Sequence, residues 1–151
     1  MDGRGAIATA MGARTSGRQA ALQMLFAIDG AKDADVETII RGFWRAFEAD
    51  PEGRAYAESL VRGVASSFAR VDALIRASST NWRLERMARA DRNLLRMATY
   101  ELLEHEAVPR AVILDEAVEL AKVFGTEESG AFVNGVLDRV AEEIGRVDLD
   151  R

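Results

Sequence analysis

The sequence of 151 residues contains no cysteine, only two prolines and a single histidine. Without cysteine the chain forms neither a disulfide framework nor a thiolate metal site, and one histidine cannot supply a histidine pair for a metal. No apolar run approaches the roughly 20 residues that span a bilayer, and the N-terminus lacks the apolar core of a secretion signal. These absences predict a cytoplasmic protein with no metal site and no membrane segment.

The sequence also contains almost no residues in a pattern typical of a catalytic site. His105 lies between two glutamates just before Pro109, where a solvated side chain is the favoured interpretation. The three acids between residues 115 and 119 spread over the polar face of a predicted helix. The evenly spaced glycines of the C-terminal segment are not followed by Gly-Lys-Ser/Thr, so they form no P-loop. The sequence predicts neither an enzyme nor a bound cofactor.

What the sequence does contain is helical periodicity. Apolar residues make up 48% of the chain and charged residues 30%, and no segment alternates as a strand does. We therefore expect an all-α fold of about seven helices in a compact bundle. The expected elements cover 17–29, 36–47, 51–75 as one long central helix, a short turn at 82–87, a helix beginning near Asp91, one from Pro109 to Phe124, and one from Thr126 to Ile144.

Two of these helix starts rest on capping side chains. Ser16 followed three residues later by Gln19 makes a capping box, so the first helix is expected to begin at residue 17. Asp91 lies inside the apolar arc of its own helix, where an unpartnered carboxylate is costly. We expect Asp91 to be an N-cap that accepts hydrogen bonds from the amides two or three residues later.

The charges are distributed unevenly along the chain, whose formal net charge is -5. Residues 81–100 hold five arginines against two acids, with Arg89, Arg92 and Arg96 on one predicted helix face, whereas residues 101–151 hold thirteen acids against five cations. This asymmetry suggests one surface that attracts phosphate and another that attracts a basic partner. Taken alone, the charges are equally compatible with solvated helix faces, and that is the simpler interpretation.

The last predicted helix breaks its own pattern. Phe132 lies at the flank of the apolar stripe, Asn134 points away from it, and Gly135 occupies a helix interior. One interpretation makes Phe132 edge core, Asn134 a helix–helix hydrogen bond and Gly135 a site of tight packing. The other adds Phe124 and makes the cluster a surface for unpaired bases, with aromatics that stack and an amide that reads base edges.

Five stretches of the chain form a distinctive series, in order, over about residues 14–144: Arg18–Phe26, Asn81–Met87, Asp91–Leu102, Val112–Gly125 and Phe132–Asp138. Together they resemble the NusB family of bacterial transcription antitermination factors. The resemblance implies a helical fold of two subdomains and a heterodimer with the small-subunit ribosomal protein also called NusE. It further implies that this pair binds the boxA element of ribosomal RNA leader transcripts and helps RNA polymerase read through terminators.

The resemblance also assigns residues by position. It implies RNA-facing roles for an N-terminal basic arm and for the cluster at the last helix, and partner contacts on the helix that begins near Asp91. The RNA-facing residues are Arg14, Arg18, Phe124, Glu128, Phe132 and Asn134, and the partner-facing residues are Asp91 and Arg92. Glu128 belongs to the first set because it lies near the proposed phosphate path. Since the chain is acidic, we expect weak RNA binding alone and strong binding with a basic partner.

Other organisations stay open at this point. The domain is expected over 14–146, between a flexible extension at 1–13 and a frayed tail at 147–151, with Met11 as an alternative initiator to Met1. NusB-like modules also occur fused to ribosomal RNA methyltransferases, so an RNA- or protein-interaction module in ribosomal RNA maturation is the alternative function. A protein-interaction domain without an RNA role, and a free homodimer, are further alternatives.

Overall fold

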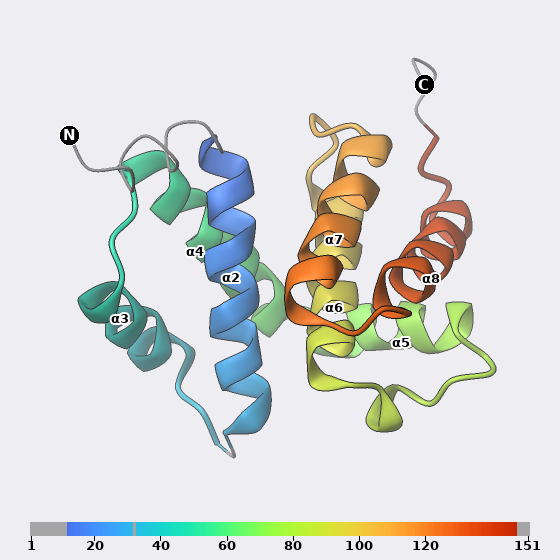
Figure 1. The fold of residues 1–151 in the computed structure, drawn as a ribbon, viewed down its shortest axis with the longest axis horizontal. Coiled ribbons are helices and arrows are strands. Elements are labelled where there is room, and N and C mark those ends of the chain that lie inside the picture. The colour runs from blue at the N-terminus through green and yellow to red at the C-terminus, as the bar shows by residue number, and fades with distance from the viewer. Residues whose placement is uncertain (1–11, 32, 148–151) are drawn as a thin grey trace. The chain divides into compact units, whose positions relative to one another are not determined.

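The structure is a computed structural model that describes residues 12–31 and 33–147. Over these residues it contains seven α-helices, one 3-10 turn and no strand, which confirms the all-α prediction (Figure 1). The helices are α2 (Ala13–Gly30), α3 (Val36–Ala46), α4 (Pro51–Ser66), α5 (Phe68–Ser78), α6 (Arg89–Glu104), α7 (Arg110–Phe124) and α8 (Ser129–Glu143), with the turn η1 (Leu84–Arg86) before α6. None of the helices in this part of the chain is long and apolar enough to cross a membrane.

The chain divides into two compact units, Met1–Ala65 and Ser66–Arg151, called unit 1 and unit 2 below. Unit 1 contains α2, α3 and α4. A Cβ added to Gly17 of α2 would lie 3.0 Å from the Gly53 carbonyl oxygen and 3.1 Å from Tyr56 Cβ, so this glycine permits a close approach to α4. The Asp50 carboxylate accepts a 2.7 Å hydrogen bond from the Gly53 amide, and α4 begins at Pro51, as predicted.

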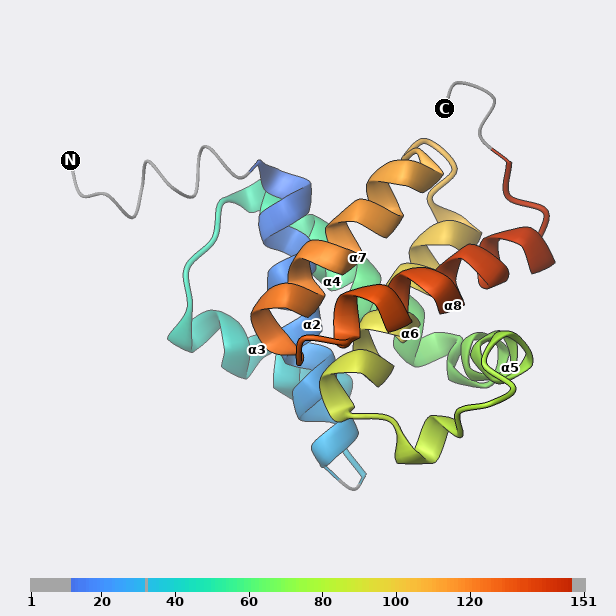
Figure 2. The same ribbon diagram turned by 45° about the vertical axis from the view of Figure 1, so that its right-hand side comes forward.

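Unit 2 is built from α5 to α8. Its helices α6, α7 and α8 pack pairwise, and α5 packs against α6 and α8 (Figure 2). The apolar stripes that the sequence showed meet in one core, in which Leu95, Val133 and Leu137 are fully buried. Burying side chains of this size stabilises a fold by about 1.5–3 kcal/mol each. The unit is thus a rigid base for the surface residues of α6 and α8.

The predicted single helix over 51–75 is wrong. The helix breaks at Ser67, whose φ of -126° and ψ of 17° leave the helical region, close to the boundary between the two units. The apolar stripe continues across the break, which is why periodicity alone joined the two halves. Serine side chains compete with the backbone for hydrogen bonds, so the pair Ser66-Ser67 offers a local reason for the interruption.

The capping box predicted at Ser16 is also wrong. Helix α2 already begins at Ala13, after Gly12 at a φ of 77°, and the Ser16 hydroxyl donates to the Ala13 carbonyl at 3.3 Å. A hydroxyl inside a first turn returns its hydrogen bond to a preceding carbonyl instead of capping a following amide. Residues 1–11 of the predicted extension at 1–13, and residues 148–151 of the predicted tail at 147–151, lie outside the described residues.

Candidate functional site

Three aromatic side chains and one amide lie at the surface of unit 2, on the loop before η1, at the end of α7 and in the first turns of α8. Phe124 is the last residue of α7 and 37% exposed, and Asn134 is exposed on α8. Phe132 is half-buried against the core, and its ring meets the edge of Trp82 with centroids 5.8 Å apart at 75°. Trp82 itself is 61% exposed. We call Trp82, Phe124, Phe132 and Asn134 the aromatic edge.

The α7–α8 junction depends on a close approach of backbone and side chain. A Cβ added at Gly125 would lie only 2.4 Å from Ser129 Oγ. That hydroxyl accepts a 2.9 Å hydrogen bond from the Thr126 amide, and the Glu128 carboxylate accepts one of 3.1 Å from the Thr126 hydroxyl. Helix α8 therefore begins at Ser129, three residues later than predicted, because these side chains hold a turn first.

The structure decides part of the choice between core packing and a binding surface on α8. A Cβ at Gly135 would meet only Arg139 Nη2, at 3.9 Å, so tight helix packing does not explain this glycine. Asn134 makes no side-chain hydrogen bond among the described residues. Phe132 fits both the core and the binding-surface interpretation, because its ring packs on the core and is only partly buried.

The two N-terminal arginines lie in unit 1 and differ in exposure. Arg14 is exposed, with its guanidinium carbon 5.9 Å from the centroid of the Tyr56 ring. Arg18 is only 2% exposed and stacks over the same ring at 5.5 Å. A cation over an aromatic face is stabilised there. Arg14 therefore offers its charge to solvent, whereas a contact of Arg18 with RNA stays a prediction that requires this side chain to move.

The predicted partner residues stand at the start of α6. Asp91 lies in the first turn and does not cap the helix, because α6 already begins at Arg89. Its Oδ1 atom is buried and has no hydrogen-bond partner among the described residues. Arg92 instead donates to the carbonyls of Leu84 and Met87, each at 3.2 Å, and so ties η1 to α6.

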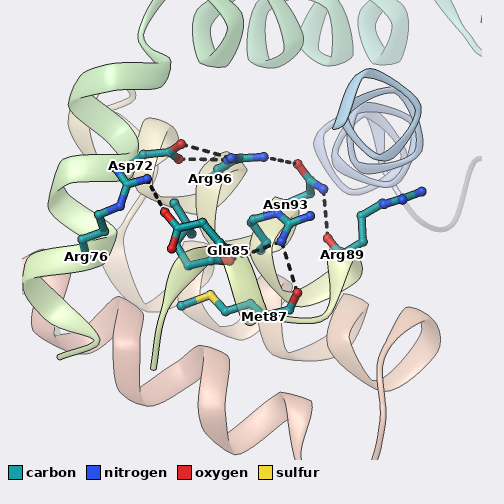
Figure 3. Close-up of polar contacts among 9 residues, drawn as sticks. Asp72, Arg76, Glu85, Met87, Arg89, Asn93 and Arg96 are labelled. Atoms are coloured by element: carbon teal, nitrogen blue, oxygen red, sulfur yellow. Dashed lines mark hydrogen bonds and ion pairs between the residues drawn. The ribbon is translucent and has the colours of Figure 1, made fainter. Parts of the chain in front are cut away.

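The sequence predicted Arg96 on an exposed basic helix face, and this prediction is wrong. The Arg96 side chain is buried, with only 9% of the residue exposed. Its guanidinium forms a two-point ion pair with Asp72 of α5, with Nε to Oδ1 at 2.9 Å and Nη2 to Oδ2 at 3.0 Å (Figure 3). It also lies 5.1 Å from the centroid of the Phe68 ring and donates to the Asn93 amide oxygen at 3.3 Å. The Arg96 side chain therefore holds unit 2 together.

Unit 2 also carries an exposed ion pair and the exposed Trp82. Arg76 of α5 pairs with Glu85 of η1 at 2.7 Å, and this contact lowers the pKa of the Glu85 carboxyl below its ordinary value (Figure 3). Trp82 was not among the residues predicted to face bases. A tryptophan flanked by Asn81 and Arg83 outside any apolar stripe was the signal for an exposed ring.

The part of the chain that the structure describes holds no cluster of three or more histidine or acidic side chains that could bind a metal. The chemistry of the described surfaces is stacking, hydrogen bonding and ion pairing.

Comparison with known proteins identifies relatives of the chain. Residues 15–142 match the model of the NusB family. A transcription antitermination protein NusB of Sorangium cellulosum is 64% identical over 141 residues, which cover 93% of this chain and 100% of that protein. The corresponding protein of Myxococcus xanthus is 46% identical over 140 residues, covering 90% and 99%.

Solved structures agree with the fold. A T. maritima NusB structure has a TM-score of 0.80 at 39% identity and covers 86% of this chain and 91% of that one. A crystal structure of antitermination factors NusB and NusE in complex with dsRNA has a TM-score of 0.78, covering 87% and 97%. At 22% identity, the second likeness concerns the fold alone.

Proposed function

The chain belongs to the NusB family of transcription antitermination proteins, and on this premise we propose that it binds boxA-type single-stranded RNA of ribosomal RNA leader transcripts. It does so together with the small-subunit ribosomal protein NusE, and the complex promotes read-through by RNA polymerase. The chain is a transcription factor and not an enzyme. Because it acts on nascent transcripts, we place it in the bacterial cytoplasm.

The observation that carries this proposal is the aromatic edge. Exposed aromatic rings are stacking platforms for unpaired bases, and an exposed amide such as that of Asn134 can read base edges. Phe124 and Phe132 are the stacking residues in this proposal. Arg14 contacts phosphate, with Arg18 behind it on the Tyr56 ring. Glu128, exposed before the first turn of α8, borders the path of the phosphates.

The partner role follows from charge and from the start of α6. A chain of net charge -5 neutralises few phosphates, so the counterion release that drives RNA binding is small for the chain alone. A basic ribosomal protein would supply the missing positive charge. We assign Asp91 and Arg92 at the start of α6 to contacts with the ribosomal protein. The Asp91 Oδ1 atom, which has no hydrogen-bond partner in the described residues, is covered in the free chain and must become accessible to accept a hydrogen bond from that protein.

The experiment that tests this function is a mobility-shift assay with leader RNA and the pair of proteins. We expect the chain to co-elute with the purified ribosomal protein in gel filtration. The pair should then retard a leader RNA that carries boxA and retard a boxA-scrambled RNA of equal length much less. Co-elution with equal retardation of both RNAs would contradict boxA recognition, and failure to co-elute would contradict the partner assignment.

A further inference from the structure

Unit 1 carries a second basic and aromatic surface, which lies away from the aromatic edge in sequence. A groove between α3 and α4 is lined by Ile40, Arg41, Trp44, Arg45, Arg54 and Arg62, together with two glutamates. We call it the arginine groove. Ile40, only 3% exposed, forms an apolar base, and the arginine side chains are exposed in an otherwise acidic protein.

The aromatic ring of the groove is held in place. The Trp44 indole N–H donates to Glu58 Oε2 at 3.0 Å, and the Arg54 guanidinium carbon lies 5.0 Å from the centroid of the Trp44 ring. Phe43 meets the same ring edge-on, with centroids 5.0 Å apart. A guanidinium stacked on an aromatic face keeps its N–H donors at the rim, where they remain available to an anion.

Both glutamates of the groove are engaged by one arginine. Arg62 donates to the two oxygens of Glu37 at 2.9 Å each and pairs with Glu58 at 2.9 Å. The contact with Arg62 lowers the pKa of the Glu37 carboxyl, so this pair stays ionised at neutral pH. Among the described residues Arg41, Arg45 and Arg54 form no close ion pair, although the charge of Arg41 helps to lower the pKa of Asp35 and Glu37. Arg41 also donates to the Thr38 hydroxyl at 3.3 Å.

We propose that the arginine groove is a phosphate-binding site for single-stranded RNA, which holds the sugar-phosphate backbone of the transcript outside the bases read at boxA. Three exposed guanidinium groups along one groove match a row of phosphates, because each guanidinium presents a planar fork of donors. The neighbouring Phe47, 52% exposed and stacked on Phe43 at 4.6 Å, adds an aromatic surface suited to bases of any sequence. The identity of the ligand as RNA rests on the proposed function.

The test uses the pair with the ribosomal protein and two leader RNAs, one that contains boxA alone and one that continues beyond it. Arg45→Gln/Arg54→Gln should weaken binding of the long RNA about 25-fold in 0.1 M salt, since each lost phosphate contact costs about 5-fold. The slope of log affinity against log salt should become shallower by about 1.4. Binding of the boxA-only RNA should not change.

The matched control is Arg70→Gln/Arg76→Gln, which changes the net charge by the same amount at arginines outside the groove that make exposed ion pairs. Gel filtration first establishes that both variants still form the pair. This control should bind both RNAs like the natural sequence. Because Trp44 lies in the groove, the change in tryptophan emission on addition of the long RNA should be smaller in the double variant than in the natural sequence.

Unchanged affinity and salt slope for the long RNA in Arg45→Gln/Arg54→Gln would overturn the proposal while leaving boxA binding intact. A glutamate-rich peptide that binds the groove, and loses binding in that variant while RNA binding persists, would identify an acidic protein segment as the occupant instead. Failure of the unaltered pair to bind either RNA would overturn both this inference and the proposed function.

Discussion

Replacing Asp72 by alanine should lower the free energy of unfolding by about 3–5 kcal/mol, because it removes one partner of a buried ion pair. The side chains of Asp72 and Arg96 are only 14% and 10% exposed, and both carboxylate oxygens accept from the guanidinium. The variant would keep the Arg96 charge in the protein interior without this carboxylate. Thermal and urea unfolding followed by circular dichroism measure the loss.

Glu85→Ala is the matched control for Asp72→Ala. It removes the carboxylate of an ion pair whose side chains are more than half exposed, where water screens both charges. We expect a far smaller change in unfolding free energy than for Asp72→Ala. Equal losses in the two variants would contradict the conclusion that Arg96 holds α6 against α5.

Phe132→Ala should weaken RNA binding by the pair by about 1–3 kcal/mol if the ring stacks on a base. The same change should lower stability, because the half-buried ring also packs on the core of unit 2. Since the ring is not fully buried, the loss of stability should fall below the roughly 3–5 kcal/mol of a fully buried phenylalanine. Fluorescence titration with leader RNA and thermal unfolding of one preparation measure both effects.

Phe132→Leu separates stacking from packing. Leucine retains most of the apolar contact with the core but has no aromatic face. The free energy of unfolding of Phe132→Leu should therefore lie close to that of the natural sequence, whereas its affinity for RNA should be as low as that of Phe132→Ala. If Phe132→Leu binds leader RNA as tightly as the natural sequence, the ring does not stack, and the edge-on contact with Trp82 is purely structural.

Periodicity placed most helices correctly, since an apolar stripe at 3.6-residue spacing needs only a core to face. Prolines and glycines fixed several ends, as at Pro51, Pro109 and Gly125. The starts assigned to Ser16 and Asp91 failed because a short polar side chain in a first turn is locally indistinguishable from a cap. The break at Ser67 was missed because the apolar pattern runs through it.

The exposure of arginines could not be read from the sequence. Arg96 lies on a polar arc of its helix, but its partner Asp72 is 24 residues away, and only the fold brings the two together. Arg18 is likewise buried over a ring from another helix. The arginine groove could not be predicted from the sequence for the same reason, because α3 and α4 each carry only part of it.

We infer that this acidic chain holds single-stranded transcript tightly only in a pair with its basic ribosomal partner. The most direct measurement is the dissociation constant of boxA leader RNA for the chain alone and for the pair, in the same buffer. Two additional phosphate contacts in the pair would tighten binding about 25-fold in 0.1 M salt, so we expect at least that difference. Equal dissociation constants for the chain and the pair would contradict the account.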